Sequence, residues 1–100
     1  MLREVVNLQD DDLMILKKKI AYHVSRRANL ELETLLKHFW GQCGQILSPD
    51  QLKKFEELLS TDDMDLLEMI LGLKPVPVKE WQEIIALIRK SWNSRRSSSQ

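Results

Sequence analysis

The sequence has little of several features that would point to particular classes of protein. Of its 100 residues, three are glycine, three are proline and one is cysteine. The lone Cys43 excludes an intrachain disulfide framework and suits a reducing compartment. No apolar run approaches the roughly 18 residues of a membrane span. The formal net charge is zero, so the chain has no overall electrostatic attraction to nucleic acid or an anionic membrane, and we expect neither partner.

The N-terminal segment does not look like a targeting signal. It lacks a continuous apolar stretch, and the acidic run at 10–12 would be unfavourable in a signal peptide. A mitochondrial matrix protein would need a transit peptide, which these residues do not resemble. We therefore expect a cytoplasmic protein of bacterial type.

The residues that are abundant favour helices. Leu, Glu, Lys and Asp dominate, and apolar residues recur at helical spacing in five segments. The predicted buried stripes are Leu13, Leu16, Ile20 and Val24; Leu32, Leu35, Leu36, Phe39 and Trp40; Leu52, Phe55, Leu58 and Leu59; Leu66, Leu67, Ile70 and Leu71; and Trp81, Ile84, Ile85, Ile88 and Trp92. The pattern predicts an all-α fold, a compact five-helix bundle, in a single domain of residues 1–100. Its helical core is expected at about 10–93, and a disordered tail at 94–100.

Local signals mark where the predicted helices begin. Asn29 is a good N-cap residue for the second helix. In the run SPDQ, Ser48 is expected to be the N-cap and Gln51 to complete a capping box at the third helical position. Thr61 or Asp62 is expected to cap the fourth helix.

Glycine and proline mark where the helices end. Gly41 and Gly44 are expected to end the second helix, and Gly72 the fourth, in the position after a helix where glycine is favoured. The last helix is expected to start near Pro77, because proline is tolerated in a first turn but not in a helix interior.

No catalytic or metal-binding constellation stands out. Cys43 lies near His38, so a small enzyme with a Cys–His dyad is one alternative, but no third member accompanies the pair. The acidic run at 62–65 lacks the Gly and distal Glu of a calcium loop, and helix capping explains it better. There is also no glycine-rich phosphate loop. We expect no catalytic residue, no metal, and no cofactor bound by this chain alone.

Arg26 and Arg27 stand at a predicted helix junction, between the first two stripes. Arginine forks suit the carboxylates and carbonyls of a partner. Arg27 and Glu31 can pair, but in the less favourable order, for at most roughly 0.2–0.5 kcal/mol. Local physics gives no strong structural need for the arginines, so a partner-binding role and a solvated surface both remain open.

Three segments resemble a known family in their order and spacing. Residues 22–31 resemble its aromatic-containing first helix leading into an Arg-Gly-x-x-Glu motif. Residues 58–66 resemble its Leu-rich Asp-Asp-x-Asp-Leu stretch. Lys74-Pro75 matches a Lys-Pro pair that precedes the last helix of the family. The chain is identified, over roughly residues 13–92, as a member of the FAD assembly factors of succinate dehydrogenase and fumarate reductase, some of which were once described as bacterial antitoxin components.

This resemblance implies a five-helix assembly factor, or chaperone, that is not an enzyme. It would dock on the flavoprotein subunit and promote covalent FAD attachment to a histidine of that subunit, with FAD belonging to the client. The alternative is a helical adaptor, or a toxin-neutralising partner, with a different client. The implied partner-binding residues are Arg26, Arg27, Ala28, Asn29 and Glu31. Arg27 and Glu31 match the motif, whereas Ala28 stands where the family has glycine.

Overall fold

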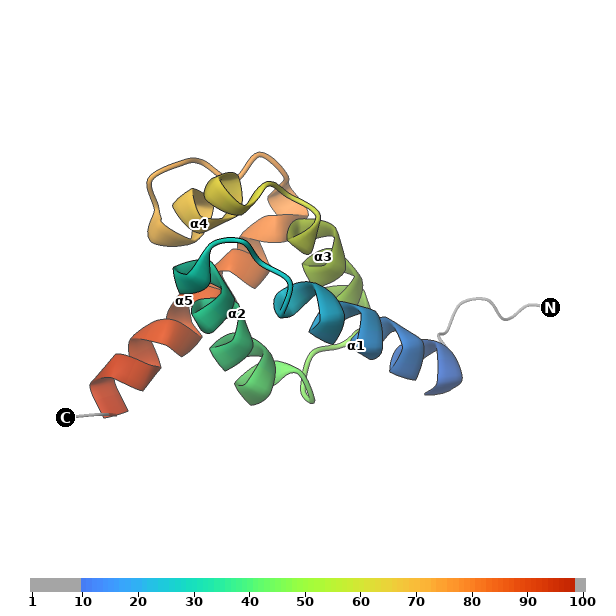
Figure 1. The fold of residues 1–100 in the computed structure, drawn as a ribbon. Helices are drawn as coiled ribbons and strands as arrows, with labels where there is room; N and C mark the ends of the chain where they lie inside the picture. Colours follow the sequence, from blue (N-terminus) through green and yellow to red (C-terminus); the bar gives the residue numbers. More distant parts are fainter. Residues whose placement is uncertain (1–9, 99–100) are drawn as a thin grey trace.

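A computed structural model describes residues 10–98 of the chain, and the predicted all-α class is confirmed over this range (Figure 1). Residues 1–9 and 99–100 lie outside the described part. The five helices are α1 (Asp10–Val24), α2 (Leu30–Cys43), α3 (Pro49–Leu59), α4 (Asp63–Leu71) and α5 (Lys79–Ser98). None of the described helices is both long enough and apolar enough to cross a membrane.

The helices pack around α5 and α3 rather than in a simple sequential array. α5 contacts α2, α3 and α4, and α1 lies against both α2 and α3. In Figure 1, α4 sits over one end of the bundle, above the connection between α1 and α2. This arrangement brings the first turn of α4 next to a loop more than thirty residues earlier in the chain.

One hydrophobic cluster forms the core, and all five helices contribute side chains to it. Most of these side chains belong to the predicted stripes. Phe39 of α2 and Phe55 of α3 are fully buried and meet edge to face, with ring centroids 5.2 Å apart. Trp40 stacks on Phe55, with ring centroids 5.9 Å apart. Edge-to-face and offset stacks are the favoured arrangements of aromatic rings, so this trio ties α2 to α3.

The predicted N-caps are confirmed. The Asn29 side chain accepts a hydrogen bond from the Leu32 amide at 2.9 Å. Ser48 and Gln51 exchange the two bonds of the capping box, at 2.9 and 3.1 Å. Of the two candidates for α4, the cap is Asp62. Each cap satisfies an amide that has no partner inside its helix.

Two helix ends differ from the prediction. Gly41 lies inside α2, which runs on to Cys43, so the expectation that Gly41 ends this helix is wrong. Gly44 does follow the helix end, in a right-handed conformation. The backbone of α5 stays helical to Ser98, five residues beyond the predicted end of the core at residue 93. Charged and Ser-rich segments can continue a helix that packing has already nucleated, which explains this difference.

Gly72 ends α4 as predicted. Its backbone is left-handed, with φ of 81°, and its amide donates back toward the last turn of α4. Arg89 of α5 completes this end, since its Nε and Nη2 donate to the carbonyls of Ile70 and Met69 at 2.8 and 2.6 Å. Cations and donors at a helix C-terminus are favourable, so α4 is fixed at both ends.

Candidate partner-binding site

The connection between α1 and α2 carries the residues that the sequence singled out. α1 stops at Val24, where the Ser25 hydroxyl donates to the carbonyl of Ala21 at 3.0 Å. Arg26 follows and is exposed, with its guanidinium 4.7 Å from the centre of the Tyr22 ring. This contact holds Arg26 on the outside of the molecule, where a partner can reach it.

Arg27 has a different environment from its neighbour. Its side chain is only 9% exposed, and Nη1 lies 3.3 Å from Oδ1 of Asp63 in the first turn of α4. Nε and Nη1 are buried and find no hydrogen-bond partner within the described residues. A buried guanidinium is costly unless a carboxylate accompanies it, so Asp63 is what makes the inward position of Arg27 tolerable. The pair that Arg27 and Glu31 could form at their spacing is not among the ion pairs of residues 12–94.

Asp63 also holds the backbone of the connection. Its Oδ2 accepts hydrogen bonds from the amides of Ala28 and Asn29, at 2.9 and 3.3 Å. One carboxylate therefore binds the side chain of Arg27 and the next two backbone amides. Charge-assisted bonds of this kind are stronger than neutral ones, and here they fix the connection against α4. We refer to residues 26–31 together with Asp63 as the junction site.

The side chains that follow in the junction site point outward or cap. Asn29 is the N-cap of α2, while Ala28, Leu30 and Glu31 are exposed. Glu31 lines a shallow hollow of about 400 Å³ between α2, α4 and α5, whose wall includes Arg89. Glu31 has no ion pair among residues 12–94, so its carboxylate is available to a partner.

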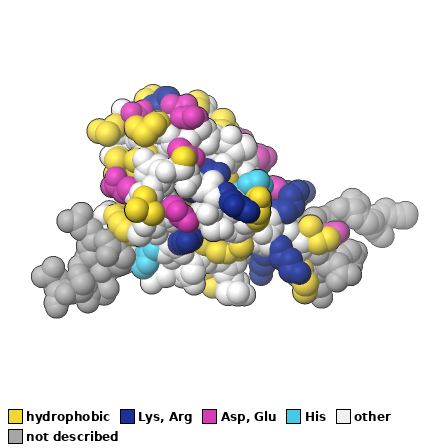
Figure 2. Space-filling model, in the orientation of Figure 1, with side chains coloured by type: hydrophobic (Ala, Val, Ile, Leu, Met, Phe, Trp, Pro, Cys, Tyr) yellow, Lys and Arg dark blue, Asp and Glu magenta, His cyan; other side chains and the backbone are white. Residues whose placement is uncertain are grey.

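Two exposed apolar residues, one within the junction site and one beside it, were not among the predicted site residues. Leu30 is 74% exposed and Met64 is 51% exposed. The Met64 sulfur lies 4.0 Å from Nδ2 of Asn29, so the two chain segments adjoin at this point. In the face shown in Figure 2, acidic and hydrophobic side chains alternate over α4, and Lys and Arg gather toward α1. Both residues are apolar but lie outside the buried stripe of their helix. An apolar residue in such a position is the sequence signal that could have identified them as surface contacts.

The five predicted site residues are thus together but not alike. Arg26, Ala28 and Glu31 are surface residues, Asn29 is a cap, and Arg27 has a largely buried side chain that pairs with Asp63. Asp63 was expected to act at a helix start and was not among the predicted site residues. Because it lies 36 positions after Arg27, no local spacing connects the two.

The Cys–His alternative gains no support. Burial raises the pKa of the Cys43 thiol, whereas a nucleophilic cysteine needs a lowered pKa. The His38 ring packs edge to face on Trp92, with centroids 5.8 Å apart. Within the part of the chain whose side chains are described, no three His, Cys, Asp or Glu residues converge to hold a metal ion.

The fold and the junction site define a small helical protein with a braced surface motif suited to recognising another protein. Residues 18–92 match the family model described as flavinator of succinate dehydrogenase. The chain therefore belongs to this family, as its sequence motifs indicated.

Curated relatives agree with the assignment. The chain is 39% identical over 64 residues to the FAD assembly factor SdhE of Legionella pneumophila strain Paris, covering 64% of this chain and 80% of the relative. It is 28% identical over 83 residues to the mitochondrial succinate dehydrogenase assembly factor 2 of Aedes aegypti, covering 81% of this chain. The match spans about half, 52%, of that mosquito protein. No solved structure shows significant similarity to the chain.

Proposed function

We propose that this protein binds the flavoprotein subunit of succinate dehydrogenase or fumarate reductase and promotes covalent attachment of FAD to it. Family membership over residues 18–92 supports the proposal. The observation that carries it is the brace between Arg27 and Asp63, which fixes the family's motif in one conformation. A surface fixed before binding loses less conformational entropy on association.

The roles within the junction site follow from exposure. Arg26 and Glu31 offer an exposed guanidinium and an exposed carboxylate, so they make direct charged contacts with the client. Arg27 is a positioning residue, because its side chain is turned toward Asp63. Ala28 sets how closely the client's backbone approaches the connection.

The chemistry belongs to the client and its flavin. Holding reacting groups in a productive geometry accelerates a reaction without any chemical step by the holder. The protein acts in this way, as an assembly factor without a turnover site of its own. FAD is bound by the client, and the compartment is the cytoplasm.

The test is a strain that lacks this protein, complemented with variants and assayed for flavin that stays on the flavoprotein subunit under denaturing conditions. We expect Glu31→Ala and Arg26→Ala to reduce the covalent flavin signal and the affinity for the subunit. Glu80→Ala is the matched control, since Glu80 is an exposed carboxylate in the first turn of α5. A wild-type chain that neither binds the subunit nor raises its covalent flavin would overturn the proposal.

A further inference from the structure

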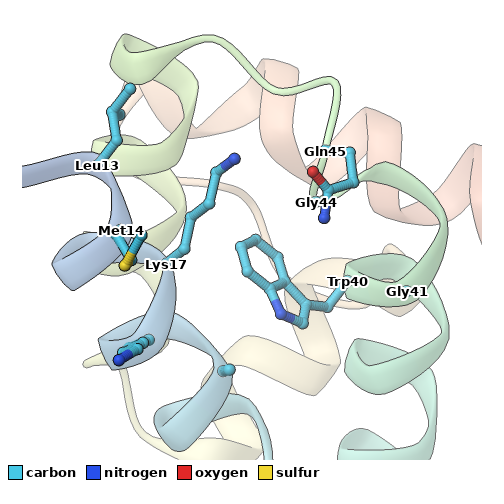
Figure 3. Close-up of a pocket in the computed structure, with 9 residues that line it drawn as sticks. Leu13, Met14, Lys17, Trp40, Gly41, Gly44 and Gln45 are labelled. Carbon is cyan, nitrogen blue, oxygen red and sulfur yellow. The ribbon is translucent and has the colours of Figure 1, made fainter. Parts of the chain in front are cut away.

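A groove separate from the junction site lies between α1 and α2. It has a volume of about 610 Å³ and is open to solvent. Figure 3 shows its lining: Trp40 projects from α2 between the two helices, and Lys17 reaches over from α1. Trp40 is nine residues after Glu31 on α2, so the groove is roughly 13 Å along the helix from the motif.

The groove combines an apolar wall with unpaired positive charge. Leu13, Met14 and Trp40 line it, and Met14 is 56% exposed. Lys17 and Lys18 also line it, and neither has an ion pair among the residues whose side chains are described. Their neighbour Lys19 differs, because it pairs with Glu56 of α3 at 3.4 Å. None of the described residues that line the groove is acidic.

Two glycines line the groove beside Trp40. A Cβ on Gly41 would meet no atom within 4 Å, so this residue leaves open space on the α2 wall. A Cβ on Gly44 would lie 2.6 Å from the Trp40 carbonyl oxygen and 3.1 Å from its ring. Gly44 therefore permits the chain to turn tightly beside Trp40. A glycine inside a helix costs about 1 kcal/mol relative to alanine, and Gly41 has no packing contact that accounts for this cost.

We propose that this groove is a second docking site, and that it takes an acidic segment of the client flavoprotein subunit. An apolar side chain of that segment packs against Trp40 and Met14, and its carboxylates meet Lys17 and Lys18. The occupant follows from charge. Lys17 and Lys18 have no acidic neighbour among the described residues that line the groove, so they favour an anionic ligand, and the apolar wall favours one with a hydrophobic side chain. The identity of the client rests on the function proposed above.

Engaging both sites has a consequence for affinity. The junction site includes the connection between α1 and α2, the two helices that border the groove, so binding at one site holds the client close to the other. The second contact is then intramolecular, and affinity rises without any change at the motif.

The experiment measures the Kd of the full chain for the purified flavoprotein subunit, with three groove variants. Gly41→Leu fills the groove from an open position in α2, and Gly41→Ala is its matched control. Lys17→Glu with Lys18→Glu reverses the charge. We expect about a tenfold or greater loss of affinity for Gly41→Leu and for the charge reversal, and little change for Gly41→Ala. Wild-type affinity should fall with added salt more steeply than that of the charge-reversed variant.

The outcomes separate the two proposals. If the wild-type chain does not bind the subunit, the proposed function fails and the groove loses its assigned occupant. If the subunit binds and Glu31→Ala weakens binding, but both groove variants bind as wild type does, only the groove proposal is overturned.

Nuclear magnetic resonance gives an independent test of the groove. The Gly41 amide signal and the Trp40 indole signal should broaden when the subunit binds, and unchanged signals would also overturn the groove proposal. A wild-type dimer that Gly41→Leu dissociates, detected by light scattering, would assign the groove to a second copy instead.

Discussion

Arg27 and Asp63 face one another across the contact between the α1–α2 connection and the first turn of α4, with 3.3 Å between Nη1 and Oδ1. Their side chains are 9% and 24% exposed, so this ion pair is less accessible to solvent than the surface pair of Lys19 and Glu56. Arg27, the arginine of the motif, therefore stabilises the fold through this ion pair. It also couples the motif to the first turn of α4, which is part of the 58–66 segment that resembles the family.

The first prediction concerns the stability that this pair provides. Asp63→Ala should lower the free energy of unfolding by about 2–3 kcal/mol, because it leaves a buried guanidinium without its counter-ion and two backbone amides without their acceptor. Urea denaturation followed by circular dichroism measures this. Lys19→Ala, at an exposed pair, should change stability by less than about 1 kcal/mol.

A double-mutant cycle tests whether the two residues act together. Arg27→Ala and Asp63→Ala should couple by about 1 kcal/mol or more; strict additivity would show that the pair does not act as a unit.

The second prediction concerns Ala28, which stands in the motif's glycine position. Its side chain is exposed, so Ala28→Leu should leave the unfolding free energy within about 0.5 kcal/mol of wild type. The larger side chain should nevertheless weaken binding of the flavoprotein subunit about tenfold or more, because it prevents close approach to the connection. Ala28→Gly, which removes the methyl group, should bind at least as tightly as wild type. Equal affinities for the leucine and glycine variants would show that the client does not approach this position.

The third prediction pairs two glycines whose backbones differ. Gly72 has φ of 81°, so Gly72→Ala should destabilise the protein by about 1 kcal/mol even though the new Cβ would lie no closer than 3.9 Å to Arg89. Gly41 is inside α2 with open space around it, so Gly41→Ala should stabilise by up to about 1 kcal/mol. Thermal denaturation of the two variants should therefore move the Tm in opposite directions. A shift in the same direction would contradict the conformations assigned to these glycines.

The fourth prediction concerns the thiol of Cys43. Burial raises its pKa, so at any given pH the thiolate fraction is smaller than in a free cysteine. Alkylation by iodoacetamide should be slower than for a cysteine-containing peptide, and its rate should rise with pH at a higher midpoint. The unfolded protein in urea serves as the control, since its thiol should react at the peptide rate. Faster alkylation in the folded state would revive the Cys–His alternative.

Much of the fold could be predicted from the sequence because its determinants are local. The caps at Asn29 and Ser48 use hydrogen bonds that reach only three residues along the chain, and the buried stripes follow from helical periodicity. The left-handed end at Gly72 follows from the same kind of reasoning. The extent of α5 was less predictable, because no local signal in the Ser- and Arg-rich segment fixes where its helix stops.

The sequence predicted where the candidate site lies, but not which of its side chains are exposed and which pair within the fold. The order of its residues was recognisable because a motif is a local pattern. Arg27 nevertheless turned out to be buried, and its partner Asp63 had already been explained as a helix-start residue. The exposed Leu30 and Met64 were missed because helical periodicity says which residues are buried, not which exposed ones adjoin.

The sequence by itself determined the all-α class, the helix starts and the motif, since each depends on residues a few positions apart. Only the tertiary structure decided that Asp63 braces Arg27, and that Lys17, Lys18 and Trp40 share one groove. These relationships join residues from different helices, and they depend on how α1, α2 and α4 pack. Packing is set by the whole core at once, so no local pattern encodes which polar groups it brings together.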